Sequence, residues 1–356
     1  MAKSEVESLA PFRLEPLFVQ RIWGTADLRP WYDHVTAPGA GDPIGEVWLT
    51  GDSCKVLDGP LAGKTLADVF ADQSVAMLGA RYGDKFGGKD AERTAGQSPL
   101  LLKVIFAQEK LSVQVHPDDR LAQKYGQPRG KTECWYALAA EPGAKVAAGL
   151  KPGVTLEQIE QEVTDGTLEQ SLEVLPVAAG DMVFVDAGTV HAIWPGSVLL
   201  ETQQNCDITY RLFDYGRPRE LHVAKALEAI RFQTAAGKVP PGELSAGRSV
   251  LVESDYFRVE KVFVQGTRSG DSLNSASQNL TSQAGEPAGL QYLFAAEGAG
   301  VISAVDGAAF ESVTLPSRGI VAVPAAAPAW QIEDRGGLEL IRITPRWPAQ
   351  EAGSIA

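Results

Sequence analysis

A short stretch that starts at Leu111 combines a strand pattern with side chains that bind metals. Apolar and polar residues alternate from Leu111 to His116, as in a β-strand with one polar face. Because successive side chains of a strand point to opposite faces, Ser112, Gln114 and His116 share that face. A Gln and a His two positions apart can reach the same metal ion. Pro117 ends the strand because it lacks a backbone donor.

Two other segments offer further metal ligands. Glu133 lies in a strand pattern at residues 130–136, and burying its carboxylate among apolar residues is costly unless a metal ion or a lysine faces it. His191 ends residues 180–191, which resemble the second conserved motif of cupin barrels: a Gly, five residues, usually a Pro, then a Gly and a ligand His three positions later. Gly188 permits the tight turn that brings His191 back over a barrel mouth.

Together these side chains offer an amide oxygen, a carboxylate and two imidazoles. Each residue alone has an ordinary structural explanation, so the prediction depends on their combination. Mixed oxygen and nitrogen ligation with room for a substrate is typical of catalytic Zn²⁺, and Mn²⁺, Fe²⁺ or Co²⁺ also fit. The sequence therefore predicts one divalent metal per chain, bound by Gln114, His116, Glu133 and His191.

The elements that must position these residues are mostly strands and turns. The 356 residues include 36 Gly and 22 Pro, which favours a mainly β architecture over a helical bundle. Apolar residues spaced three or four apart after Thr155 predict two amphipathic helices, with Thr155 as the N-cap and a break at Gly166. The sequence thus predicts an N-terminal domain at residues 1–150 and 176–235, a helical insertion at 151–175, a linker at 236–250 and a second domain at 251–356.

Charge and composition exclude several classes of partner. The net charge of −13 argues against nucleic acid and anionic membranes, while a local cluster of basic residues could still bind an anionic small molecule. No secretory signal or membrane span is recognisable, so we expect a cytoplasmic protein with no membrane partner, as a monomer or a weak homodimer. Cys54, Cys134 and Cys206 lack CxxC spacing and are expected to be free thiols.

Several segments, in order, strongly resemble the type I phosphomannose isomerase family. They are residues 106–119, 130–136, 188–193 and 200–217, with further matches at 21–24 and 44–48. The resemblance is good over residues 14–235 and loose in the C-terminal third. It implies a mainly β chain with two cupin-type β-barrels, or jelly rolls, and a small helical subdomain. Residues 319–324 look like a degenerate motif with no His after it, so we expect the second barrel to be metal-free.

The resemblance also implies an activity and a set of site residues. The family's zinc-dependent aldose–ketose isomerases interconvert mannose 6-phosphate and fructose 6-phosphate, and its zinc ligands fall on the four residues above. Its catalytic residues fall on Arg211, Lys131 and Glu201, with a further basic position at Arg217. We take an enediol(ate) as the intermediate and Glu201 as the candidate base, because a poorly hydrated pocket raises the pKa of a carboxyl group. An ion pair with Arg211 or Lys131 is the alternative for Glu201.

The phosphate of a sugar phosphate needs hydrogen-bond donors and positive charge. Ser112 shares the face of the predicted metal ligands, and Lys103 interrupts an apolar run where a core residue is expected. Arg217 is the third candidate. Arg211 could instead form a structural ion pair, and Lys131 could face solvent.

The cupin fold supports many chemistries, so two other functions remain open. One is a different metal-dependent enzyme, such as an oxygenase. The other is a non-catalytic sensor of sugar phosphates. The presence of Lys131, Glu201 and Arg211 together argues against a sensor, because a binding module needs no acid or base.

Overall fold

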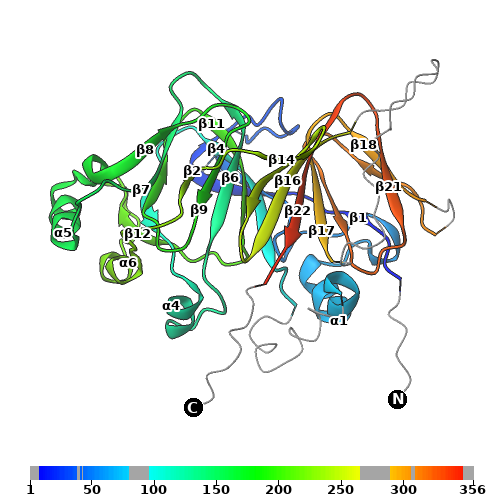
Figure 1. Ribbon diagram of the computed structural model, residues 1–356, viewed down its shortest axis with the longest axis horizontal. Helices are drawn as coiled ribbons and strands as arrows, with labels where there is room; N and C mark the ends of the chain where they lie inside the picture. Colours follow the sequence, from blue (N-terminus) through cyan, green and yellow to red (C-terminus); the bar gives the residue numbers. More distant parts are fainter. Residues whose placement is uncertain are drawn as a thin grey trace, which may run out of the picture. The chain divides into compact units, whose positions relative to one another are not determined.

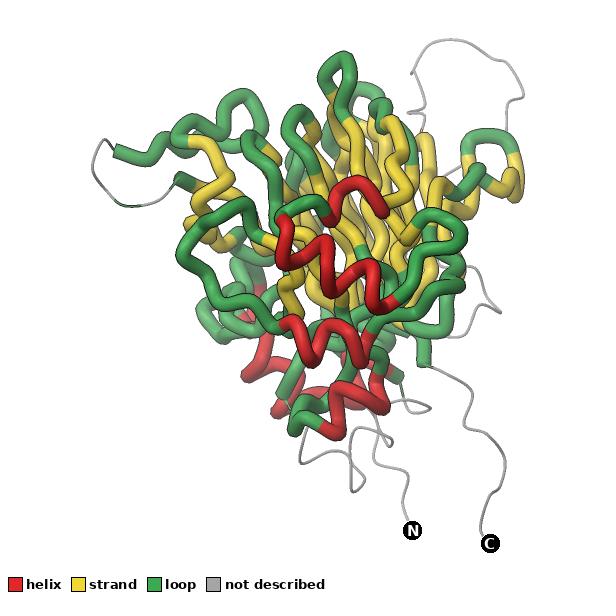
Figure 2. Tube along the Cα trace, turned by 90° about the vertical axis from the view of Figure 1, so that its left-hand side faces the viewer, coloured by secondary structure: helices red, strands yellow, loops and turns green. Residues whose placement is uncertain are grey.

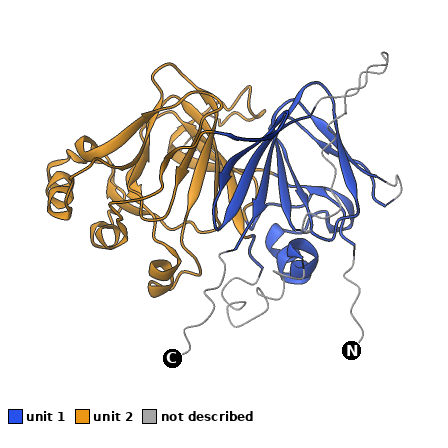
Figure 3. Cartoon of the chain, viewed as in Figure 1, with its two compact units in different colours: residues 1–15, 52–98, 241–356 blue, residues 16–51, 99–240 orange. Residues whose placement is uncertain are grey.

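The computed structural model describes residues 8–37, 41, 43–79, 96–264, 289–305 and 309–347. They form two compact units (Figure 3): unit 1 from residues 1–15, 52–98 and 241–356, and unit 2 from residues 16–51 and 99–240. The boundary after residue 240 falls within the expected linker at 236–250. Residues 1–15 and 52–98, expected in the N-terminal domain, group with unit 1 instead.

Backbone hydrogen bonds explain why these early residues belong to unit 1. Strand β1 (Phe12–Arg13) pairs with β20 (Ile320–Val323). Helix α1 (Leu66–Leu78) begins at the N-cap Thr65 in a capping box, and its last carbonyls accept hydrogen bonds from the amides of Ala325 and Ala326. These pairings join segments that are over 200 residues apart in the chain, so no local sequence pattern reveals them.

Unit 2 is built from two antiparallel sheets (Figure 1). The larger has the order β13-β9-β6-β11-β4-β3-β2 and the smaller the order β12-β5-β10-β7-β8. The strands of the larger sheet are β2 (Leu17–Thr25), β3 (Ile44–Trp48), β4 (Leu100–Ala107), β6 (Glu133–Ala140), β9 (Met182–Val185), β11 (Ser197–Gln204) and β13 (Gly237–Lys238). Those of the smaller sheet are β5 (Val113–Val115), β7 (Lys145–Leu150), β8 (Leu172–Pro176), β10 (His191–Ile193) and β12 (Tyr210–Phe213).

Alternation along these strands separates two cores from the polar site. Ile105 and Leu199 of the larger sheet pack with Val146 and Ile193 of the smaller one, which defines an interior between the sheets. Val113 and its neighbours on the smaller sheet turn outward and pack against the helices. Polar residues on the inner faces are therefore enclosed between the sheets, where the candidate site lies.

The helices of unit 2 lie outside its sheets (Figure 2). They are α4 (Asp119–Lys124), α5 (Leu156–Asp165), the 3₁₀ turn η2 (Leu168–Ser171) and α6 (Val223–Ala229). The predicted start of α5 is confirmed, because Thr155 accepts a hydrogen bond from the Gln158 amide and Gly166 ends the helix with a left-handed φ of 73°. The second predicted helix is wrong: Leu172–Pro176 forms β8, which pairs with β7.

Unit 1 repeats the arrangement of two facing antiparallel sheets. Its larger sheet has the order β1-β20-β17-β22-β16-β15-β14 and its smaller sheet the order β19-β18-β21. The remaining elements are η1 (Gly59–Leu61), β14 (Gly242–Ser245), β15 (Arg248–Glu253), β16 (Phe257–Val264), β17 (Gln291–Glu297), β18 (Gly300–Ala304), β19 (Val313–Leu315), β21 (Trp330–Asp334) and β22 (Leu338–Pro345). The fold class predicted from the sequence is confirmed.

Two smaller expectations concern the cysteines and the membrane. Cys54, Cys134 and Cys206 are buried free thiols, as predicted. No helix in the described part of the chain has the length and the apolar composition needed to cross a membrane.

Candidate metal centre and cavity

Three of the four predicted metal ligands meet inside unit 2. His116 follows β5, Glu133 begins β6 and His191 begins β10, and all three are buried. One ligand atom from each lies within 4.8 Å of the others. The two carboxylate oxygens of Glu133 are each 3.4 Å from a ring Nε2, one on His116 and one on His191. The strands thus bring together residues that are up to 75 positions apart.

The hydrogen bonding of this cluster suits the binding of a cation. Both ring nitrogens of His116 and both carboxylate oxygens of Glu133 are buried and find no hydrogen-bond partner among the described residues. Buried polar atoms in folded proteins are nearly always paired, so the two Glu133 oxygens and the His116 Nε2 that faces them indicate a group that would bind these three atoms. A divalent metal ion meets this requirement.

The charge states of these side chains also suit metal binding. Burial lowers the pKa of His116 to about 3 and lowers that of His191, so both imidazoles are neutral near pH 7. Burial disfavours an ionised Glu133, yet the Lys131 ammonium 3.3 Å away and the neighbouring His116 hold the pKa of the carboxyl well below its usual value. Neutral imidazole and ionised carboxylate are the forms that ligate metals.

The local backbone fixes the orientation of His191. Its Nδ1 donates a hydrogen bond to the Thr189 carbonyl at 2.9 Å, which leaves Nε2 as the acceptor that faces Glu133. Gly188 has a φ of 91°, and a Cβ there would lie 2.6 Å from Cγ of Arg231. Its amide donates to the His116 carbonyl at 2.8 Å, so the turn joins the two histidines. The role predicted for Gly188 in the turn agrees with this geometry.

Gln114, the fourth predicted ligand, lies beside His191. Its Nε2 is 3.1 Å from His191 Nε2, and its Oε1 accepts a hydrogen bond from the Ser112 hydroxyl at 3.1 Å. The amide therefore presents nitrogen toward the cluster. A rotation of the amide by 180° would place oxygen there, and the two orientations differ only in the hydrogen bonds that they make.

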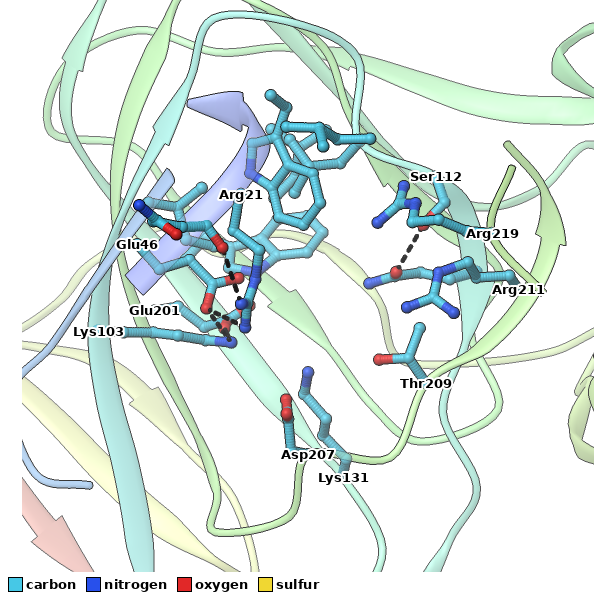
Figure 4. A pocket seen from close by; sticks show the side chains of 18 residues that line it. Arg21, Glu46, Lys103, Ser112, Lys131, Glu201, Asp207, Thr209, Arg211 and Arg219 are labelled. Atoms are coloured by element: carbon cyan, nitrogen blue, oxygen red, sulfur yellow. Dashed lines mark hydrogen bonds and ion pairs between the residues drawn. The ribbon is translucent and has the colours of Figure 1, made fainter. Parts of the chain in front are cut away.

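A cavity of about 400 Å³ opens beside the cluster (Figure 4). Gln114 and Lys131 contact both the cavity and the metal cluster. Ser112, Thr209, Arg211 and Arg219 lie on one side of the cavity in the view, and Glu46, Lys103 and Glu201 lie on the other. The volume is within the range of pockets for small ligands.

Glu201 lies on the side of the cavity that it shares with Glu46 and Lys103 (Figure 4). On β11 it pairs with Lys103 of β4 and Trp135 of β6. Its Oε2 is 2.8 Å from Lys103 Nζ, and its Oε1 accepts a hydrogen bond from Trp135 Nε1 at 2.9 Å. Burial and the Glu133 charge raise the pKa of the Glu201 carboxyl, although Lys103 opposes the shift. The ion pair predicted as the alternative for Glu201 is thus formed, but with Lys103 rather than Arg211 or Lys131.

Lys103 lies between two carboxylates and is only 4% exposed. Besides Glu201, its Nζ has Glu46 Oε2 at 3.8 Å. Burial opposes the charged ammonium, yet the two carboxylates raise the pKa of Lys103 well above its usual value. The predicted phosphate contact is therefore already neutralised by neighbouring acids, although Lys103 does line the cavity.

Arg211 and Arg219 supply the positive charge of the other side. Arg211 lies on β12 beside Gln114 of β5. Its buried Nε has no hydrogen-bond partner in the described ranges, and burial together with the Arg219 charge lowers its pKa. Arg219 donates two hydrogen bonds to the Asp214 carboxylate, at 2.7 and 2.5 Å. Both guanidinium groups line the cavity.

Arg217, the third predicted phosphate contact, is engaged elsewhere. Its guanidinium forms an ion pair with Asp214 at 2.9 Å and donates to the Lys110 carbonyl at 2.7 Å. Among the described residues that line the cavity, the arginine from this segment is Arg219. Both arginines follow a turn at Tyr215 and Gly216, which have left-handed φ.

Four charged residues of the cavity were not predicted from the sequence: Arg21, Glu46, Asp207 and Arg219. Glu46 accepts hydrogen bonds from Trp48 Nε1 at 2.7 Å and from Arg21 at 3.1 Å. A signal was available for it, because Glu46, like Lys103, interrupts an apolar strand. Arg219 lies in a polar turn and carries no such signal.

Comparisons with known proteins identify similar chains. Residues 11–176 match the family described as phosphomannose isomerase type I, catalytic domain. A probable mannose-6-phosphate isomerase, GmuF, from Bacillus subtilis is 35% identical over 270 residues, which is 72% of this chain and 80% of the relative. A mannose-6-phosphate isomerase from Streptococcus mutans is 33% identical over 271 residues, 71% of this chain and 80% of the relative.

Solved structures share the fold. The crystal structure of the mannose 6-phosphate isomerase from Bacillus subtilis superposes with a TM-score of 0.76 at 27% identity, over 94% of this chain and 99% of that chain. A mannose 6-phosphate isomerase solved with bound zinc and yttrium superposes with a TM-score of 0.69 at 17% identity, over 95% and 100%. The second likeness concerns the fold alone.

Proposed function

The chain belongs to the type I phosphomannose isomerase family of aldose–ketose isomerases, and on that premise we propose that it interconverts mannose 6-phosphate and fructose 6-phosphate with a bound divalent metal. The observation that carries the proposal is the buried cluster of His116, Glu133 and His191 beside a cavity with a carboxyl group of raised pKa. The substrate in this proposal is a small sugar phosphate.

We propose Zn²⁺ as the metal, held by His116, Glu133, His191 and the amide oxygen of Gln114. Two imidazoles with oxygen ligands and an open side suit catalytic zinc, and Mn²⁺, Fe²⁺ or Co²⁺ are the competitors. When bound, the metal ion acts as a Lewis acid that stabilises negative charge developing on the carbonyl oxygen of the sugar.

Glu201 is the proposed base for the hydrogen that moves between C1 and C2 of the open-chain sugar. The carboxylate accepts the proton from C2 of the aldose, which gives an enediol(ate), and then delivers it to C1, while a second proton passes from the C2 hydroxyl to O1 to complete the ketose. A raised pKa favours both transfers near neutral pH. Trp135 and Lys103 hold one carboxylate oxygen each, so the base has a fixed orientation.

Cationic side chains bind and orient the rest of the sugar. Arg211 and Lys131 line the cavity and can donate hydrogen bonds to the sugar oxygens that gain charge. Arg219 and the Ser112 hydroxyl are the proposed phosphate contacts, and Arg217 acts on them indirectly through the Lys110 carbonyl. Lys103 is assigned to holding Glu201 rather than to the phosphate.

A coupled isomerase assay with and without metal tests the proposal. We expect the purified protein to convert mannose 6-phosphate, to lose activity with a chelator and to regain it with Zn²⁺, while glucose 6-phosphate and unphosphorylated mannose react poorly. Absence of turnover in metal-replete protein would contradict the proposal. Oxygen consumption with a sugar phosphate would favour an oxygenase instead.

A further inference from the structure

Glu169 of η2 joins three distant segments outside the cavity. Both of its carboxylate oxygens are 2.8 Å from Lys110 Nζ. Its Oε1 also accepts hydrogen bonds from Trp194 Nε1 at 2.9 Å and from the Tyr215 hydroxyl at 2.8 Å. Burial disfavours the ionised carboxyl, yet Lys110 and Tyr215 lower its pKa, so Glu169 is charged at neutral pH. We call Glu169, Lys110, Trp194 and Tyr215 the latch.

Tyr215 adopts a backbone conformation that its own preferences oppose. Its φ is 55°, in the left-handed region that is unfavourable for a residue with a Cβ. The ring packs edge-on to Phe213 at 4.9 Å, and Lys110 Nζ and the Arg217 guanidinium lie 5.0 and 5.4 Å from its centre. The hydrogen bond to Glu169 and these ring contacts therefore keep the turn in place.

The turn at Tyr215 leads directly to the cavity. Four residues later, Arg219 reaches the cavity wall and bonds to Asp214 at the start of the same turn. Arg217 donates to the carbonyl of Lys110, and Leu111 and Ser112, which follow Lys110, also line the cavity. The latch thus holds two parts of the cavity wall in place: Arg219, which follows Tyr215, and the pair Leu111 and Ser112, which follows Lys110.

We propose that Glu169 of the helical insertion and Tyr215 of the turn after β12 are positioning residues, which hold Arg219 and Ser112 where they bind the anionic end of the substrate. This inference rests on the proposed function for its substrate. The anionic end does not react, so the latch contributes to binding of substrate and transition state alike. Its loss therefore raises KM and leaves kcat nearly unchanged.

Two variants test the latch by kinetics. Tyr215→Phe removes only the hydroxyl, and Glu169→Gln removes the charge while keeping the shape of the side chain. Loss of a hydrogen bond to a charged group predicts a KM for mannose 6-phosphate that is raised about tenfold, with kcat within about twofold and metal content unchanged. The matched control is Glu160→Gln, an exposed residue of the same insertion, with wild-type KM. An unchanged KM in both variants, or an equal loss of kcat, would overturn the proposal.

Amide hydrogen exchange gives a readout that does not need turnover. The amides of Arg217, Arg219 and His222 donate to backbone carbonyls, so they report on the turn. In both variants we expect faster exchange in a peptide covering residues 214–222, with no change in β4. Unchanged exchange there would overturn the latch even in an active enzyme. A wild-type protein without isomerase activity would instead contradict the proposed function, and the exchange data would still decide whether the latch holds the turn.

Discussion

Glu201 of unit 2 and Glu260 of unit 1 are both buried carboxyl groups on strands. The residues two positions away, Leu199 and Val262, pack in the interior between the sheets of each unit. Glu201 has one ion-pair partner within 3 Å, Lys103, and its pKa is raised by burial and by Glu133. Glu260 has two partners within that distance, Arg342 and Arg258, and a third, Arg248, at 3.2 Å. These arginines outweigh burial and lower its pKa.

The surroundings of the two carboxyl groups also differ, because one interior is apolar and the other is polar. The interior of unit 1 is closed by apolar side chains from both sheets, among them Leu293, Ile332 and Leu340. In unit 2 the corresponding space contains a cavity, two buried lysines and polar atoms that have no hydrogen-bond partner among the described residues. Within the same architecture, the arginines around Glu260 suit a carboxylate that stabilises the fold, while the single cationic partner of Glu201 suits the proton transfer proposed for it.

The largest expected effect is on the metal cluster of unit 2. His191→Ala removes a ligand and should lower bound metal and reduce kcat/KM by more than about a hundredfold, the upper end of the effect for residues that only orient a ligand. Metal analysis and the coupled assay measure both. Unchanged metal content would remove His191 from the ligand set. His34→Ala, away from the cavity lining, is the matched control.

The next effect separates the two glutamates directly. Glu201→Gln should reduce kcat by about a hundredfold, the lower end for loss of a general base, and leave metal content intact. Glu260→Gln should leave kcat unchanged, because Glu260 lies in unit 1 and outside the cavity lining. Equal kinetic effects of the two substitutions would show that the raised pKa of Glu201 has no catalytic meaning.

Much of the polar site could be predicted from local patterns. Alternation in residues 111–116 placed Ser112 and Gln114 on one wall, and the spacing after Gly188 indicated His191 as a ligand. Such patterns work because side-chain direction in a strand depends only on position. The amphipathic start of α5 was predictable for a similar reason, since its cap and its apolar face are local.

The remaining features depend on contacts that the chain makes over long distances. Leu172 continues the helical spacing of α5, yet pairing with β7 overrides it and forms β8. Arg219 rather than Arg217 lines the cavity, after a turn in which Tyr215 bonds to Glu169, nearly fifty positions away. The partner of Glu201 follows from the register of β4 against β11, which the sequence does not reveal.

Substitution of an apolar residue inside unit 1 should affect stability without affecting catalysis. Ile332 is fully buried on β21 within the apolar interior. Ile332→Ala should destabilise the protein by about 3 kcal/mol, from lost burial and the resulting cavity, with KM and kcat unchanged. Urea unfolding monitors the change, and Val305→Ala at an exposed position is the control. A lower kcat in fully folded Ile332→Ala protein would contradict the assignment of stability to unit 1 and catalysis to unit 2.

The smallest expected effect concerns the pH dependence of Glu260. Because its folded pKa is lower than that of the unfolded chain, its stabilisation is fully present above the unfolded value of about 4.3 and is lost as pH falls through the folded value. Glu260→Gln removes the charge, so at pH 7 it should cost about 2 kcal/mol, less than for a fully buried pair, since Arg248 and Arg258 are partly exposed. The difference in Tm between wild type and variant should then shrink steadily below pH 4, as the wild-type carboxyl takes up its proton. A difference that is independent of pH would mean that the shape of the side chain, rather than its charge, stabilises unit 1.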